Sequence, residues 1–131
     1  MGPAGWSHRY LRERIEKVEH EHSWRHSAIY PYFFADRRLS YVKVRFIDKQ
    51  NDKTFRQWAI SSNGVWVSRR KAGKAPLLYR LNTLAAAEVI FICSGEKAAD
   101  RGVADLGITT TSTSDGEGQW SGEYTKPLVG N

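Results

Sequence analysis

The short polar run Ser94–Lys97 is the stretch where chemistry is first expected in this 131-residue chain. It follows the apolar run Val89–Cys93, which predicts a buried strand of a parallel sheet. Ser94-Gly95 would make a tight turn after that strand. Ligands of such sheets bind beyond the carboxyl ends of the strands, so Glu96 and Lys97 would stand at the rim where a ligand binds.

A second candidate site is the loop Arg69–Pro76, which contains four cations and a glycine. Lys and Arg neutralise phosphates, so this loop suits a nucleic-acid backbone and predicts salt-sensitive binding. It lacks the Gly-Lys-Ser/Thr ending of a Walker loop. Trp58 and Trp66 would stack on unpaired bases or, alternatively, pack in the core. The predicted nucleic-acid-binding residues are Arg45, Arg56, Trp58, Arg69, Arg70, Lys71 and Lys74.

The charge of the chain is unevenly distributed. The net charge is +6, yet residues 36–80 hold twelve Lys or Arg against three Asp, whereas residues 81–131 hold three against seven Asp or Glu. A basic middle predicts a polyanion as partner, and simple solubility is the alternative.

Metal-ligand clusters are scarce in the sequence. Cys93 is the single cysteine, which excludes an internal disulfide and a cysteine-based zinc site. His22 and His26 have helical i,i+4 spacing and His20 lies nearby, but no further ligand completes a set. The longest apolar run is too short to span a bilayer and Met1–Trp6 does not resemble a signal peptide, so a cytoplasmic protein without membrane contact is expected.

The elements around the basic loop predict a small antiparallel unit. Ser7–His22 indicates a charged helix with a narrow apolar stripe, either solvated or leaning on a partner. Ala28–Phe34 and Leu39–Ile47 form a predicted hairpin, whose second strand has one apolar face and one basic face. Asp48–Lys53 is predicted as a loop. Thr54–Ile60 and Val65–Ser68 follow as strands, with a tight turn at Asn63-Gly64.

The second half predicts a strand–helix–strand unit. Leu77–Ala87 has helical spacing, Val89–Cys93 is the central strand, and Glu96–Leu106 is a helix that Gly107 stops before a strand at Ile108–Thr111. The expected fold class is α/β (α+β), with a right-handed crossover. The predicted domains are a helical extension (1–27), an antiparallel β unit (28–76) and a partial Rossmann-like unit (77–131). Ser112–Gly118 is predicted as a polar loop, and Trp120 and Tyr124 are expected to anchor the segment that follows it.

Several blocks in this order resemble one family: YPYFFADRRLSYVKVRF, DKTFRQW, a Gly-Val-Trp strand, LLYRL, VIFICSGEKAAD and LGITTTSTSDGEGQW. The chain is similar, over roughly residues 28–130, to the TOPRIM-containing primases and primase–helicases of phages, plasmids and mobile elements. The resemblance implies a TOPRIM fold, Mg²⁺ as cofactor, catalytic roles for Glu96 and Lys97, and metal ligation by Glu96 and Asp100. Magnesium would bind phosphate oxygens and stabilise charge developing in phosphoryl transfer.

The chain departs from the family pattern at two places. Ser94 stands where the family has its leading glutamate, and Ala98 stands where it has an aspartate. The family also continues after a Pro-Leu-x-Gly segment, here Pro127–Gly130, into a strand carrying Asp-x-Asp, and this sequence stops at Asn131. A serine hydroxyl cannot replace the charge of a carboxylate toward a divalent ion.

Three interpretations follow. The first is a nucleic-acid-binding module related to DNA primases, as a fragment or truncated relative without a complete metal site, with single-stranded DNA or RNA as partner. The second is an active Mg²⁺-dependent primase or nuclease in which Glu96 and Asp115 or Glu117 rebuild the site. The third is a small interaction protein that binds a replication or defence protein by strand addition at the exposed hairpin edge. A replicative helicase is a further expected partner, and the open edge of the incomplete sheet would allow self-association.

Overall fold

The computed structural model describes residues 8–113, and within them the chain has mixed α/β structure. It divides into two compact units. The first comprises residues 1–31 and 39–75, and the second comprises residues 32–38 and 76–131. No helix in the described part is long and apolar enough to cross a membrane. The predictions for the rest of the Ser112–Gly118 loop, Trp120, Tyr124 and Pro127–Gly130 lie outside the described residues.

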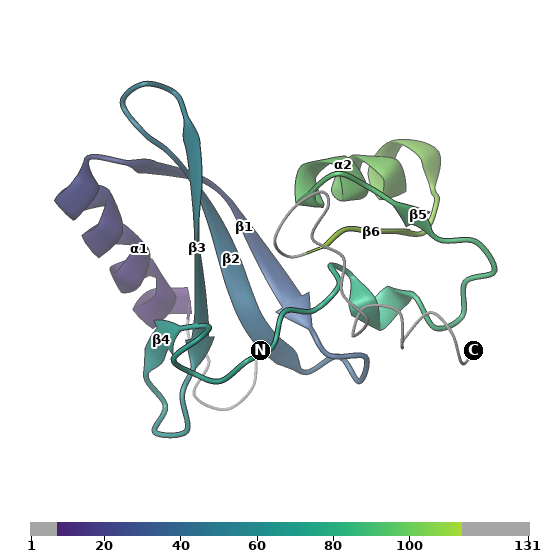
Figure 1. Ribbon diagram of the computed structural model, residues 1–131, viewed down its shortest axis with the longest axis horizontal. Coiled ribbons are helices and arrows are strands. Elements are labelled where there is room, and N and C mark those ends of the chain that lie inside the picture. Colours follow the sequence, from purple (N-terminus) through teal and green to yellow (C-terminus); the bar gives the residue numbers. More distant parts are fainter. Residues whose placement is uncertain (1–7, 114–131) are drawn as a thin grey trace. The chain divides into compact units, whose positions relative to one another are not determined.

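The first unit contains helix α1 (His8–His22) and a four-stranded antiparallel sheet whose strands follow sequence order (Figure 1). The strands are β1 (Arg25–Phe33, whose last two residues fall in the second unit), β2 (Leu39–Ile47), β3 (Lys53–Ile60) and β4 (Trp66–Ser68). The predicted hairpin, third strand and fourth strand are therefore confirmed. The Asn63-Gly64 turn is also present, and Gly64 has a φ of 81°, which glycine adopts without strain.

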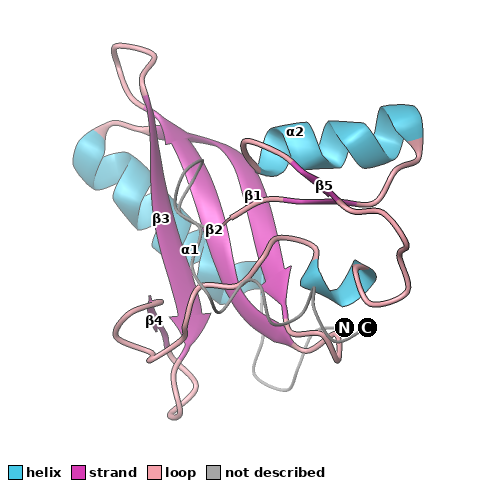
Figure 2. Ribbon diagram, turned by 45° about the vertical axis from the view of Figure 1, so that its right-hand side comes forward, coloured by secondary structure: helices cyan, strands magenta, loops and turns pink. Residues whose placement is uncertain are grey.

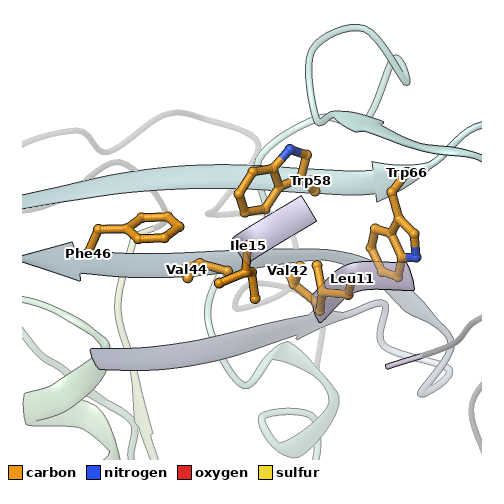
Figure 3. Packing of buried hydrophobic residues seen from close by; sticks show 7 residues of the cluster. All are labelled: Leu11, Ile15, Val42, Val44, Phe46, Trp58 and Trp66. Carbon is orange, nitrogen blue, oxygen red and sulfur yellow. The ribbon is translucent and has the colours of Figure 1, made fainter. Parts of the chain in front are cut away.

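One face of this sheet and one face of α1 form the core of the first unit. Val42, Val44 and Phe46 alternate along β2 and point to the same side, where they meet Leu11 and Ile15 of the helix (Figure 3). Trp58 and Trp66 complete this cluster from β3 and β4. Figure 2 shows α1 lying across that face of the sheet. The helix is thus held by buried apolar contacts, and the prediction that it is solvated is wrong.

The opposite face of β2 differs from the expected open basic surface. Tyr41 is fully buried and Lys43 is 5% exposed. The Arg69 guanidinium lies 5.6 Å from the centre of the Tyr41 ring, and the Lys43 ammonium lies 4.5 Å from the centre of the Phe55 ring. Aromatic rings thus attract two of the cations on this side of the unit. Arg45 is the β2 cation that stays partly exposed.

The second unit contains the predicted strand–helix–strand order. β5 (Phe91–Ile92) is followed by α2 (Glu96–Arg101) and the π-helical segment η2 (Gly102–Leu106), and β6 (Thr110–Thr111) then pairs parallel to β5. Gly107 ends the helical segment with a φ of 66°, as its sequence position predicted. In the same unit, Leu78, Leu81 and Leu84 form a small apolar cluster.

Two predictions for the second unit are wrong. The expected buried strand Val89–Cys93 shortens to two residues, and Phe91 and Ile92 are 49% and 58% exposed. Among the described residues β5 pairs with β6 alone. The expected helix Leu77–Ala87 is only a 3₁₀ turn, η1 (Leu81–Thr83). Arg80 explains this second difference, because its left-handed backbone (φ 62°) is incompatible with a continuing helix.

Candidate nucleic-acid interface

The basic loop that follows β4 is a closed and internally bonded structure. The backbone N–H groups of Ala72, Gly73 and Lys74 donate to the carbonyl oxygens of Ser68, Arg70 and Arg69, at 3.0–3.1 Å. The Arg69 guanidinium also donates to the Lys74 carbonyl oxygen, at 2.9 Å. Arg69 is only 8% exposed, so it braces the loop from inside.

The seven predicted nucleic-acid-binding residues fall into three groups by exposure. Arg56, Arg70 and Lys71 are exposed. Arg45 and Lys74 are half-buried, and Arg45 donates to the Ser27 hydroxyl at 2.8 Å. Trp58 and Arg69 are buried. The exposed group is therefore the part of the prediction that can reach a phosphate.

Trp58 and Trp66 occupy the core of the first unit. Trp58 is 9% exposed and Trp66 is 3% exposed, and the Trp58 ring lies edge-on to Phe46 at 6.3 Å between centroids (Figure 3). A base needs an open ring face for stacking. Neither ring has such a face in the structure, so both tryptophans have the core position that the alternative interpretation gave them.

The acidic side chains of the first unit are concentrated on α1, which carries basic side chains as well. Its four described glutamates are all on α1. Between residues 39 and 75 there are only two acidic residues, Asp48 and Asp52. The Asp48 carboxylate accepts the N–H groups of Gln50 and Asp52, each at 2.9 Å, and so closes its own turn. The strands and the loop therefore carry little negative charge to oppose a polyanion.

The candidate metal ligands of the second unit are hydrogen-bonded to protein groups. Glu96, at the start of α2, is 5% exposed, and the Tyr32 hydroxyl donates to its Oε2 at 2.5 Å. Asp100 accepts the Tyr79 hydroxyl at 3.0 Å and the Arg80 guanidinium at 3.1 Å. The Tyr32 and Tyr79 rings lie 5.3 Å apart between centroids. We call these five residues the tyrosine–carboxylate network.

Backbone contacts tie the same network to β6. The Tyr79 N–H donates to the Ser112 carbonyl oxygen at 2.9 Å, and the Thr111 hydroxyl donates to the Tyr79 carbonyl oxygen at 2.8 Å. Burial, followed by the hydrogen bond to Asp100 and the charge of that carboxylate, raises the pKa of the Tyr79 phenol. The phenol therefore stays protonated and remains a hydrogen-bond donor.

This arrangement does not fit a magnesium site. Mg²⁺ needs carboxylate oxygens with room for several bound waters. Here Glu96 is buried against a phenol, and Asp100 pairs with a guanidinium whose charge opposes a second cation. Across residues 8–113, no three His, Cys, Asp or Glu side chains converge in a way that could hold a metal ion. Lys97 is exposed on α2, and Asp115 and Glu117 lie outside the described residues.

The histidines of the first unit have other partners. His26 contacts Glu19, whose Oε2 accepts the His26 backbone N–H at 2.9 Å and lies 3.1 Å from its ring Nδ1. His22 stacks on Trp24 at 4.3 Å between centroids. The i,i+4 spacing of His22 and His26 does not lie on one helix, because α1 ends at His22.

Sequence reasoning missed three members of the tyrosine–carboxylate network: Tyr32, Tyr79 and Arg80. Tyr32 lies 64 residues before Glu96, so no local spacing connects them. The alternation of Tyr30, Tyr32 and Phe34 was a weak signal, because it places Tyr32 on an inward face.

Comparison of the chain with known protein families, with curated proteins and with solved structures found no match.

Proposed function

We propose that this chain is a binding module for single-stranded nucleic acid, related to the TOPRIM primases that residues 28–130 resemble. The observation that supports it most is the exposure of Arg70 and Lys71 on a loop that is braced from within by Arg69. A braced loop presents its cations at a lower entropic cost than a free one.

The charge distribution supports the same proposal. The cations of residues 39–75 are opposed by only two aspartates, and one of these closes a turn. Arg56 adds an exposed guanidinium on β3, 5.4 Å from the centre of the Trp24 ring. Phosphate neutralisation by such groups is independent of sequence, so the module would bind single strands with little base preference.

The relation to TOPRIM primases is proposed without their metal chemistry. The parallel β5–α2–β6 order agrees with such a unit, but Glu96 and Asp100 act as acceptors in the tyrosine–carboxylate network. In this proposal the network holds the second unit together, and the described residues contribute binding.

The test is the affinity for a fluorescein-labelled oligothymidine, measured by anisotropy. Arg70→Ala together with Lys71→Ala should weaken binding on the order of tenfold at about 0.1 M salt, because two phosphate contacts are lost. Arg37→Ala together with Arg101→Ala is the matched control, since both cations are exposed and lie outside the loop. An equal loss of affinity in the two double variants would mean that net charge alone, and not the loop, determines binding. Unchanged affinity in Arg70→Ala with Lys71→Ala would overturn the proposal.

A further inference from the structure

A groove runs between α1 and the turn that leads into β4. It has a volume of about 560 Å³, within the range of small-ligand sites. Tyr10, Arg14 and Lys17 line it from the helix, and Val65 and Trp66 line it from the turn and β4. Figure 1 shows the first turn of α1 next to β4.

The groove offers an open aromatic ring. Tyr10 is 55% exposed, although it belongs to the apolar stripe of α1. Val65, on the opposite wall, is 46% exposed. Since Trp58 and Trp66 are buried, Tyr10 is the most exposed aromatic side chain among the described residues of the first unit. An exposed phenol ring facing an apolar wall can hold a flat base between them.

The charges of the groove suit a phosphate next to that base. Arg14 and Lys17 are one and four positions beyond Glu13, so the wall that α1 contributes carries two cations and one anion. Another groove, of about 370 Å³ on the other side of α1, provides the contrast. Its charged lining is two glutamates, Glu16 and Glu19, against one arginine, Arg12, and Glu19 also contacts His26. The excess of negative charge disfavours a polyanion.

The groove also lies close to the basic loop along the chain. Val65 precedes the three residues of β4, and Arg69 begins the loop directly afterwards. At about 3.3 Å per residue, this strand separates the two sites by on the order of 10 Å. A short single strand can cover that distance.

We propose that this groove holds one unpaired base of a single-stranded nucleic acid, stacked on Tyr10, with its phosphate at Arg14 and Lys17. The inference rests on the proposed function and deepens it. The loop supplies sequence-independent phosphate contacts, and the groove supplies the stacking that distinguishes a single strand from a duplex, whose bases are already stacked.

The affinity test uses the same labelled oligothymidine. Tyr10→Ala should weaken binding about five- to a hundredfold, the effect of losing one stacked base. Tyr10→Phe should bind like the unchanged chain, because the ring is retained. The ratio between Tyr10→Ala and the unchanged chain should stay constant across a salt series, whereas the ratio for Lys17→Ala should shrink as salt rises.

Photo-crosslinking locates the base directly. An oligonucleotide carrying 5-bromouracil should crosslink to Tyr10, as identified by mass spectrometry of the digested protein. Ile29→Ala, in the acidic groove, is the control and should change neither affinity nor crosslink. One outcome refutes the base site in the groove and leaves the nucleic-acid function in place. In that outcome Arg70→Ala with Lys71→Ala weakens binding, Tyr10→Ala does not, and the crosslinks map to other residues. If the unchanged chain binds no oligothymidine, both the proposed function and the proposed base site are refuted.

Discussion

At the scale of single residues, the protein depends on carboxylates that accept hydrogen bonds from buried phenols. Glu96 and Tyr32 form the most buried of these pairs, with both side chains at most 5% exposed. Removing a donor from a buried carboxylate takes away part of what compensates that carboxylate for its lost hydration. The role of Glu96 is therefore testable through stability, independently of any activity.

Tyr32→Phe should lower the free energy of unfolding by about 1.5–3 kcal/mol, the usual value of a hydrogen bond to a charged group. Urea unfolding followed by circular dichroism measures this loss. Tyr10→Phe is the matched control, because it removes a hydroxyl from a side chain that is 55% exposed, and it should change stability by less than about 0.5 kcal/mol. Equal effects in both variants would contradict the structural role of the Tyr32–Glu96 pair.

Glu19 provides a pH-dependent contribution at the junction of α1 and β1. Burial acts to raise the pKa of its carboxyl, but the His26 backbone N–H, ring and charge outweigh burial and hold the pKa below 4.5, its ordinary value. A depressed folded-state pKa stabilises the protein above the unfolded pKa, and this stabilisation is lost as the pH falls through the folded value.

Glu19→Gln should therefore lose stability relative to the unchanged chain above about pH 4.5, and the difference should shrink below that pH. Thermal unfolding from pH 3 to pH 7 measures it. Glu21→Gln, at an exposed carboxylate, tests whether any surface carboxylate has this effect. A difference that grows on acidification would have the wrong sign for the Glu19–His26 contact.

At the scale of elements, the second unit depends on close packing between its helical segment and β6. A Cβ at Gly102 would lie 2.8 Å from the Thr110 Cγ2 atom. Thr110 is fully buried and its hydroxyl donates to the Ala99 carbonyl oxygen at 2.7 Å, so it has little freedom to move away. This contact brings the segment and the strand together.

Gly102→Ala should destabilise the second unit by about 1–2 kcal/mol, since overpacking exceeds the gain in helix propensity. Hydrogen exchange of the Phe91 and Cys93 amides reports the change locally, because these amides donate to the carbonyl oxygens of Thr109 and Thr111. Gly95→Ala is the control, because its Cβ would meet no atom within 4 Å. Comparable exchange rates in both variants would show that Thr110 moves aside for the added methyl group without loss of stability.

The exposure of β5 leads to a second prediction at this scale. Phe91→Ala should cost about 1 kcal/mol rather than the 3–5 kcal/mol of a fully buried phenylalanine, because half of the ring is already in water. Leu78→Ala, at a side chain 1% exposed, should cost about 2–5 kcal/mol. Urea unfolding compares the two, and a larger loss for Phe91 would mean that β5 is covered in solution.

At the scale of the whole molecule, the uneven charge predicts the salt response of binding. For single strands, the slope of log affinity against log salt changes by about 0.7 for each phosphate neutralised. Arg70→Ala with Lys71→Ala should therefore reduce the slope by about 1.4. Anisotropy titrations over a salt series measure it, and a flat response of the unchanged chain would exclude phosphate contacts as the basis of binding.

Local order could be predicted well from the sequence, because it depends on neighbouring residues. The alternation in Leu39–Ile47, the Asn63-Gly64 turn and the stop at Gly107 each follow from backbone preferences that act within a few positions. The length of the Leu77–Ala87 element was misjudged. The spacing of its leucines fits an α-helix as well as a short 3₁₀ turn. The left-handed backbone of Arg80 excludes the continuous α-helix.

What the sequence by itself determined was the order of strands and helices, the tight turns and the placement of charge. Only the tertiary structure decided that Trp58 belongs to the core, that Tyr10 stays open beside a groove, and that Glu96 meets a tyrosine 64 residues away. The physical reason is that periodicity shows which side chains share a face. Which faces are then covered, and by what, depends on contacts between segments distant in sequence.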